Sequence, residues 1–179
     1  MSERIWQRKK ILQDATFLKT VKEVVAALNK LGVRYAMVGG LAVAYHANPP
    51  VTIDADFLVD TENMDVLEVL FKGEGWGAYP LLFRVNQRGF PKFGWAMRKK
   101  GRTEVDLIST SSDAYLSSVT KNAVEVSFAG VLVPVVTVED LVVMKTLVGR
   151  EKDIDDTIAL RQAGKVDERY VKRMLDRLF

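Results

Sequence analysis

The 179-residue chain is long enough for one domain with its own hydrophobic core, or for one domain with a short helical extension. Hydrophobic residues make up 48% of it and charged residues 27%, which argues against disordered, collagen-like and coiled-coil proteins. With 26 basic and 23 acidic residues the net charge is +3, which permits an anionic substrate without requiring one.

Cysteine is absent and histidine occurs once, at His46. These counts exclude disulfide bonds, catalytic thiols and cysteine-bound metals, and they argue against zinc sites built from several imidazoles. Any metal ion should therefore have oxygen ligands, which makes Mg²⁺ (or Mn²⁺) the expected cofactor. No segment approaches the roughly 20 apolar residues of a membrane span, and the first residues lack a signal-peptide pattern, so we expect a cytoplasmic protein without a membrane partner.

The first predicted elements are a helix, a strand and a short helix. Apolar residues at helical spacing predict a helix over residues 14–31. A short apolar run predicts a strand over 33–38, and an alanine-rich stretch predicts a buried helix over 41–47. The pair Gly39-Gly40 forms the turn between them.

Strands are predicted through the middle of the chain. Apolar and β-branched residues predict a strand over 51–59, and Asp60 or Thr61 can cap the helix that follows. Alternating apolar residues and turn signals predict five further strands, over residues 81–85, 93–98, 103–109, 124–128 and 131–136. Because proline cannot donate a backbone hydrogen bond, Pro134 predicts an edge position for the last strand.

The last quarter of the chain is predicted to be helical. One helix covers residues 138–148, a second covers 153–163, and Asp167 caps a third. Strands followed by helices indicate an α+β fold, with a small mixed β-sheet, flanking helices and a C-terminal helical segment. We expect a core of residues 1–136 that includes the N-terminal helix, with residues 137–179 packed on it.

Two aspartates occupy alternate positions of the strand predicted over residues 51–59. Side chains alternate along a strand, so Asp54 and Asp56 share one face, about 7 Å apart. A hard divalent cation beside them would cancel the repulsion between the two anions. The alternative is that both carboxylates face water on a half-exposed strand. Asp54 and Asp56 are therefore either a candidate metal site or two solvent-facing carboxylates.

A third carboxylate lies on the strand predicted over residues 103–109. Asp106 and Glu104 share one face of it, and Glu104 suits a solvated hairpin position. If this strand neighbours the one that carries Asp54 and Asp56, Asp106 completes a set of three oxygen ligands of the kind that magnesium prefers. These three aspartates are our candidate catalytic and metal-binding residues.

The glycine pair is a candidate phosphate-binding turn. After a strand and before a helix, Gly39-Gly40 would let the backbone approach a phosphate at the helix N-terminus. A double glycine alone equally fits a tight turn, and the glycine patterns of dinucleotide folds and P-loops are absent from the sequence.

The order of these features resembles the nucleotidyltransferase superfamily related to DNA polymerase beta. The resemblance lies in the glycine pair, the Asp-Ala-Asp segment at residues 54–56 and the later strand with Asp106. The chain is most similar to the minimal prokaryotic branch, and residues 35–46 are similar to the bacterial AbiEii-type group. It departs from many of these relatives at Gly40, where they have serine, and at residues 49–51, where they have an arginine.

The resemblance implies a two-metal enzyme that transfers a nucleoside monophosphate from a nucleoside triphosphate to a hydroxyl of RNA, protein or a small molecule. It assigns Asp54 and Asp56 to magnesium ions that bridge the triphosphate, and Asp106 to the second ion and to activation of the hydroxyl. Gly39 and Gly40 would then bind phosphates through backbone N–H groups.

Three basic residues near the C-terminal helices complete the candidate list. The resemblance implies that Lys145 contacts the triphosphate, although the helix dipole also favours a lysine in a last helical turn. Arg150 and Lys152 suit loop charges or acceptor binding. Two other interpretations stay open: a weakly active or non-catalytic partner module of a toxin-antitoxin pair, and a scaffold whose aspartates only face water.

Overall fold

The computed structural model of the protein describes residues 15–47, 54–61, 64–85, 90–111, 113–128, 130–164 and 166–178. Seven strands form one mixed sheet in the order β3-β4-β5-β2-β1-β7-β6. The strands are β1 (Arg34–Val38), β2 (Asp54–Asp60), β3 (Gly77–Val85), β4 (Phe90–Arg98), β5 (Glu104–Ser109), β6 (Val124–Phe128) and β7 (Val131–Val135). The predicted α+β class is therefore confirmed.

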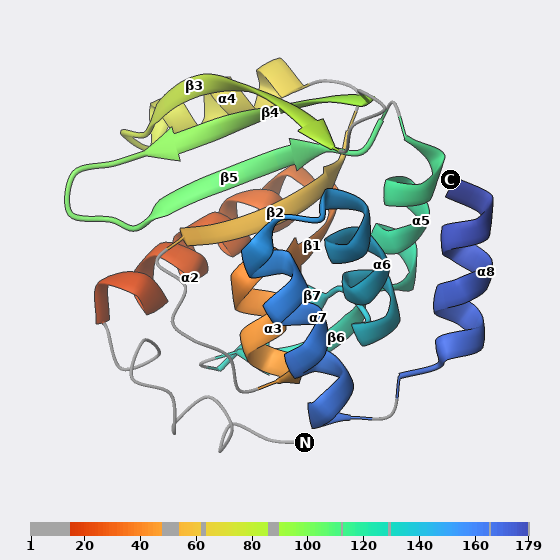
Figure 1. Ribbon diagram of the computed structural model, residues 1–179. Helices are drawn as coiled ribbons and strands as arrows, with labels where there is room; N and C mark the ends of the chain where they lie inside the picture. Colours follow the sequence, from red (N-terminus) through yellow and green to blue (C-terminus); the bar gives the residue numbers. More distant parts are fainter. Residues whose placement is uncertain are drawn as a thin grey trace.

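Helices cover both faces of the sheet (Figure 1). They are α2 (Ala15–Leu31), α3 (Gly39–His46), α4 (Met64–Gly73), α5 (Ala114–Asn122), α6 (Val138–Val148), α7 (Glu151–Ala163) and α8 (Glu168–Leu178). Figure 1 shows α2 and α4 behind the sheet and α3, α5, α6 and α7 in front of it. The strand predicted over 51–59 is described from Asp54 onward, and its first three residues lie outside the described part.

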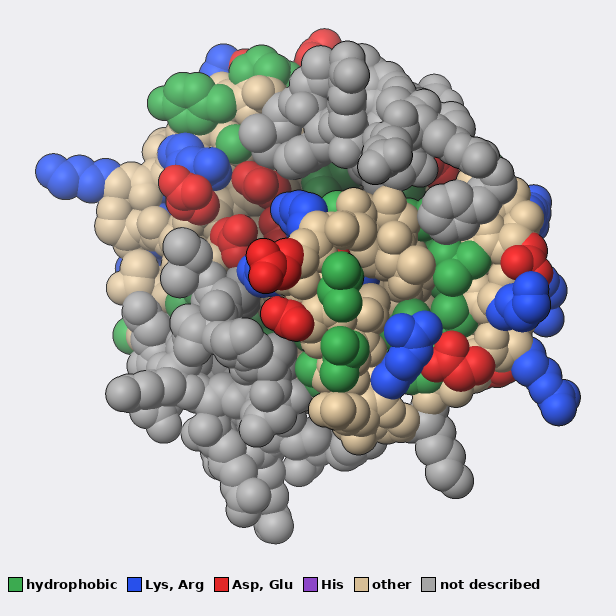
Figure 2. All heavy atoms as spheres, in the orientation of Figure 1, with side chains coloured by type: hydrophobic (Ala, Val, Ile, Leu, Met, Phe, Trp, Pro, Cys, Tyr) green, Lys and Arg blue, Asp and Glu red, His purple; other side chains and the backbone are tan. Residues whose placement is uncertain are grey.

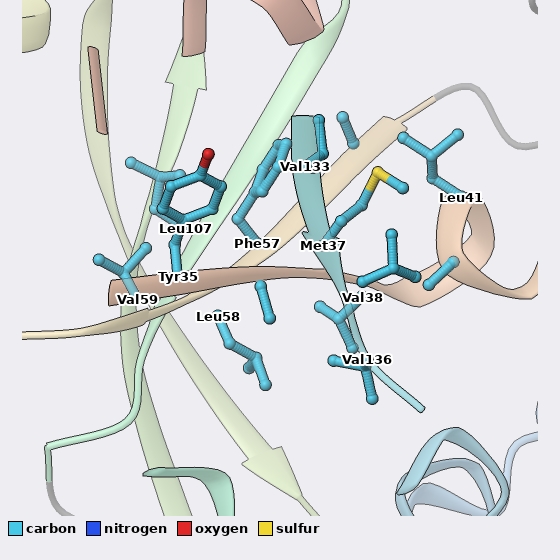
Figure 3. Packing of buried hydrophobic residues seen from close by; sticks show 14 of the residues in the cluster. Tyr35, Met37, Val38, Leu41, Phe57, Leu58, Val59, Leu107, Val133 and Val136 are labelled. Carbon is cyan, nitrogen blue, oxygen red and sulfur yellow. The ribbon is translucent and has the colours of Figure 1, made fainter. Parts of the chain in front are cut away.

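The central strands bury side chains on both faces. Phe57 and Leu107 point to one side of the sheet, while Leu58 and Val136 point to the other (Figure 3). The first side is covered by α2, whose apolar residues at helical spacing pack onto the strands. The second side carries Asp54 and Asp56 by the alternation of β2, so these aspartates face the helices in front of the sheet in Figure 1.

The C-terminal helices are tied together by one buried carboxylate. Asp140 of α6 accepts hydrogen bonds from the hydroxyls of Tyr115 in α5 (3.1 Å) and Tyr170 in α8 (2.7 Å). The hydroxyl of Thr137, which caps α6, donates to its other oxygen at 3.0 Å. Because a buried charge is tolerated only when it is hydrogen-bonded, this network fixes the three helices relative to one another.

The edge position predicted from Pro134 is wrong. The strand β7 lies between β1 and β6, and β6 forms the edge. Pairing of β7 with β1 is confined to Met37 and Val135, followed by the bond from the Val136 N–H to the Met37 carbonyl (3.1 Å). The missing N–H of Pro134 is tolerated because β1 pairs with β7 only beyond the proline.

Among the described residues, none of the helices combines the length and the apolar character needed to cross a membrane.

Close contact between β4 and β5 predicts a strict requirement for glycine at position 94. A Cβ atom at Gly94 would lie 2.3 Å from the carbonyl oxygen of Leu107. We expect Gly94→Ala to lower the free energy of unfolding by roughly 1–3 kcal/mol, measured by urea denaturation. The control is Gly164→Ala, where a Cβ meets nothing within 4 Å. Equal effects of the two variants would contradict the prediction.

Candidate active site

Strands β2 and β5 bring the predicted carboxylates together. They run parallel and in register, with Asp56 opposite Asp106 and Asp54 opposite Glu104. Residues opposite each other on neighbouring strands point to the same face. Asp54, Asp56 and Asp106 therefore share one face of the sheet, and Figure 2 shows acidic side chains gathered over this part of β2 and β5 with basic ones beside them.

The glycine turn lies directly against Asp56. Helix α3 begins at Gly39, the residue after β1, and Val38 of β1 is paired with Asp56. Gly39 has a φ of +68°, and a Cβ atom there would lie 1.9 Å from Oδ2 of Asp56. Both the backbone conformation and the space therefore demand glycine, and Gly40 follows in the first turn of the helix.

Burial and mutual repulsion perturb the carboxylates. Burial, followed by the charges of Asp54 and Asp106, raises the pKa of Asp56 to about 7, against opposing effects of Lys145 and Lys152. Burial also raises the pKa of Asp106, although Arg98 opposes the shift. The Oδ1 atom of Asp106 is buried and has no hydrogen-bond partner among the described residues. Perturbed carboxylates of this kind are typical of functional sites.

The chemistry of the three carboxylates fits a hard divalent cation. They offer only oxygen ligands, which Mg²⁺ and Mn²⁺ prefer, and a bound cation would favour ionised Asp56 and satisfy the unpartnered oxygen of Asp106. In the described part of the chain, no three aspartate, glutamate, histidine or cysteine side chains already form a group that could hold a metal. The carboxylates would have to turn towards a bound ion.

Lys145 lies in a buried ion-pair cluster. Its ammonium is 2.9 Å from Asp153 Oδ1 and 2.8 Å from Asp156 Oδ2, and its side chain is only 8% exposed. Arg150 caps α7 and binds the other oxygen of Asp153 through its Nε at 2.7 Å. The cluster joins α6 to α7 beside β2 and α3 (Figure 1). Contact between Lys145 and a triphosphate stays a prediction, and it would require the lysine to leave these carboxylates.

Two cations near the carboxylates are more exposed than Lys145. The Arg150 side chain is 69% exposed, and the charge of Asp56 contributes to raising its pKa, after the hydrogen bond with Asp153. Lys152 is exposed on the first turn of α7, and its charge lowers the pKa of Asp56. The start of α7 therefore places positive charge beside the carboxylates.

Sequence patterns missed two parts of this site. Arg98 is not among the candidates predicted from sequence, but its Nε lies 2.9 Å from Glu104 and its Nη1 lies 3.5 Å from Asp106. The available signal was strand alternation. Ala96 pairs with Asp106, and Arg98, two residues after Ala96 on β4, points to the same face of the sheet. The roles of Asp153 and Asp156 were also missed, and their spacing of three residues on one helix face was the signal.

Other candidate residues have structural roles. The ring of His46 hydrogen-bonds the Val136 carbonyl through Nε2 at 2.8 Å, which gives it a structural role. Asp60 joins β2 to Arg34 at 2.9 Å and to the hydroxyl of Thr110 at 2.9 Å. The three residues at 49–51, where relatives carry an arginine, lie outside the described residues.

Comparisons with known proteins relate the chain to nucleotidyltransferases. Residues 17–178 match the family described as "Nucleotidyl transferase of unknown function (DUF2204)". No curated protein sequence matches the chain. An antigenic nucleotidyltransferase-like protein from Paracoccidioides brasiliensis has a similar solved structure, with a TM-score of 0.54 and 20% identity over 92% of this chain and 88% of that one.

Two further solved structures are similar in fold. The structure of ANT(2")-Ia in complex with adenylyl-2"-tobramycin has a TM-score of 0.60 and 14% identity, covering 90% of this chain and 98% of that one. Lincomycin-bound LnuA, a lincosamide antibiotic adenylyltransferase, has a TM-score of 0.56 and 11% identity, covering 82% of this chain and 97% of that one. At these identities the similarity establishes a shared fold.

The raised pKa of Asp56 predicts that stability falls as the pH rises. Between its ordinary pKa of 3.8 and about 7, the folded chain retains a proton that the unfolded chain has released. This contribution is fully present below pH 4 and is lost as the pH approaches 7. Asp56→Asn, which stays neutral, should therefore be more stable than the unaltered protein at pH 8 in EDTA, by roughly 1–3 kcal/mol in the free energy of unfolding measured by urea denaturation. The difference should be smaller at pH 5.

The control for this measurement is Asp176→Asn, an exposed carboxylate on α8. It should leave the pH dependence unchanged. If Asp56→Asn lost as much stability between pH 5 and pH 8 as the unaltered protein, burial of an ionised Asp56 would not be destabilising.

Removal of Lys145 should be strongly destabilising. Lys145→Met would leave Asp156 buried without a counter-ion and Asp153 with Arg150 alone, at a cost of about 3–5 kcal/mol in unfolding free energy. The matched control, Lys172→Met, removes an exposed ion pair with Asp176 and should cost less than about 1 kcal/mol. Chemical denaturation measures both. Similar losses would show that the buried cluster does not hold α6 against α7.

Proposed function

Because the chain belongs to this nucleotidyl transferase family, we propose that it transfers a nucleoside monophosphate from a nucleoside triphosphate to a hydroxyl of an acceptor. The acceptor oxygen forms a bond to the α-phosphorus, and the bond from that phosphorus to the bridging oxygen of the β-phosphate breaks. Pyrophosphate leaves, and the hydroxyl gives up its proton. The acceptor class is RNA, protein or a small molecule.

One observation carries the proposal: Asp56 and Asp106 stand opposite each other on neighbouring strands, with a glycine turn against Asp56. A buried arrangement of like charges is unfavourable unless a cation or a proton compensates it. Stability alone gives no reason to keep it. A site that handles the charge of a triphosphate does, because phosphoryl transfer depends chiefly on positioning and charge compensation.

We assign Asp54, Asp56 and Asp106 as the residues that would hold Mg²⁺ (or Mn²⁺). When bound, two such ions would neutralise the triphosphate and stabilise the entering and leaving oxygens. Asp106 would also receive the proton of the acceptor hydroxyl on the carboxylate oxygen that does not hold the ion, and its raised pKa favours that transfer.

Phosphate binding would fall to the backbone at Gly39-Gly40 and to the start of α7. The missing side chain at Gly39 makes room for Asp56, and a phosphate would bind at the first N–H groups of α3 beside it. Arg150 and Lys152 provide exposed positive charge nearby. Lys145 contributes indirectly, because its ion pair with Asp153 positions α7, the helix that carries Lys152 and is capped by Arg150.

A second proposal, a partner module of a toxin-antitoxin pair as in the AbiEii-type group, is supported by an apolar surface on α7. Ile154 is 55% exposed and Ile158 is 49% exposed, and they lie one helical turn apart. An exposed apolar pair of this kind suits contact with another protein. The two proposals differ in whether nucleotide transfer occurs.

The test is transfer of label from α-³²P-labelled nucleoside triphosphates, ATP first, to cellular RNA, protein and small-molecule fractions in Mg²⁺ or Mn²⁺. Asp54→Ala, Asp56→Ala and Asp106→Ala should each reduce transfer by at least about a hundredfold, since each removes charge compensation from the reacting phosphate. The control, Asp65→Ala, alters an exposed aspartate on α4 and should retain activity.

Transfer that survives in all three site variants would refute the assigned residues. Stable binding of a protein partner with no transfer by the unaltered protein would favour the partner module instead.

A further inference from the structure

Arg98 ends β4 and reaches across two carboxylates of β5. Its Nε lies 2.9 Å from Oε1 of Glu104, while its Nη1 lies 3.5 Å from Oδ1 of Asp106. Nη1 also donates to the Met97 carbonyl at 3.2 Å. The guanidinium is therefore ion-paired with Glu104 and hydrogen-bonded to the backbone, whereas its link to Asp106 is longer than an ordinary hydrogen bond.

The two carboxylates differ in what they need from Arg98. The Glu104 side chain is 63% exposed, so water can solvate it, whereas the Asp106 side chain is 24% exposed and its Oδ1 is buried without a hydrogen-bond partner among the described residues. Arg98 compensates the charge of Asp106 without occupying that oxygen. The oxygen thus stays open to a stronger ligand.

We propose that Arg98 is a positioning residue that serves as a resident counter-ion for Asp106, holding positive charge there until a divalent cation binds, and that Glu104 retains Arg98 afterwards. The inference rests on the proposed function, because the cation site at Asp106 belongs to it. It adds a competition between a side chain of the protein and the incoming ion.

Other cations near the site act on carboxylates other than Asp106. Lys145 and Arg150 are paired with Asp153, and the charge of Lys152 lowers the pKa of Asp56. Among the described residues, Arg98 is the cation that forms an ion pair with Asp106. In agreement with this, the charge of Arg98 is the largest influence that opposes the rise in the pKa of Asp106 caused by burial.

The proposal makes Glu104 the residue that decides where Arg98 rests. With Glu104 present, Arg98 has a partner when a cation takes Asp106. Without Glu104, Arg98 would have only Asp106 among these carboxylates and would compete more strongly with the cation. The effects of the two residues on cation affinity should therefore depend on each other, which simple addition of charges does not require.

The experiment measures Mn²⁺ binding to the full chain by electron paramagnetic resonance, without nucleotide and at fixed ionic strength. Asp106→Asn should weaken binding at this site. Arg98→Met should tighten it and Glu104→Gln should weaken it, each by roughly three- to tenfold, as expected for a partly exposed charge pair. In the Arg98→Met background, Glu104→Gln should change the affinity by less than about twofold.

Arg34→Met serves as the matched control. Arg34 forms an ion pair with Asp60 at 2.9 Å on the other end of β2, so its removal should leave Mn²⁺ affinity unchanged. Arg98→Lys keeps the charge but cannot bridge both carboxylates, and it guards against misfolding of the methionine variant. Circular dichroism and thermal melts verify the fold of every variant.

A second readout follows Arg98 itself. The ¹⁵Nε resonance of Arg98, assigned by its loss in Arg98→Lys, should move on titration with diamagnetic Mg²⁺ and stay in place in Asp106→Asn. If Glu104→Gln weakens Mn²⁺ binding equally with and without Arg98, or the resonance does not respond, the counter-ion role is refuted while the cation site stands. If the unaltered protein binds no Mn²⁺, the cation site and this inference both fail.

Discussion

The backbone position of Asp56 is fixed from both sides. On one side the backbone of Gly39 approaches so closely that a single added carbon would collide with the carboxylate, and on the other side Asp106 stands in register on the neighbouring strand. The parallel pairing of β2 with β5 and the sharp turn from β1 into α3 are both needed for this placement. A change in either would move the carboxylate that every assigned role depends on.

Charge is distributed around this point in a way that sheet geometry explains. Carboxylates project from β2 and β5 on one face, and cations approach from two directions, Arg98 from β4 and the start of α7 from the opposite side. Neither Arg98 nor Lys145 is unpaired, since each is bound to carboxylates of its own. The charge of Asp56 therefore stays only partly compensated before any ligand arrives, in agreement with its raised pKa.

Local patterns predicted most of the fold but little of its long-range pairing. Helical spacing placed α2 and α6 within a residue of their observed ends, and alternation correctly grouped Asp54 with Asp56 on one face. The edge position assigned from Pro134 failed because the proline rule concerns one hydrogen bond, whereas strand order depends on contacts distant in sequence. The proximity of Arg98 to Asp106 depends on the register between β4 and β5, which the turn and the alternation do not specify by themselves.

The buried acids of this chain differ in how their negative charge is compensated. Around Asp56 the unfavourable charge is left partly uncompensated, and the pKa is raised accordingly. Asp140, by contrast, accepts hydrogen bonds from tyrosine hydroxyls of α5 and α8 and from the hydroxyl of Thr137, which caps its own helix. Asp153 and Asp156 are compensated by an ion pair with Lys145, so Asp56 differs from the other buried acids in having its charge largely unopposed.

The hydroxyl cluster around Asp140 also limits which amino-acid substitutions are tolerated there. Tyr115, Asp140 and Tyr170 meet at one oxygen although 55 positions separate the first from the last. Replacing Asp140 would leave two tyrosine hydroxyls without their acceptor, and replacing either tyrosine would remove a donor from the carboxylate. Single replacements are therefore disfavoured, while concerted ones are tolerated. Among divergent descendants of this chain, these three positions should therefore be inherited or replaced as a set.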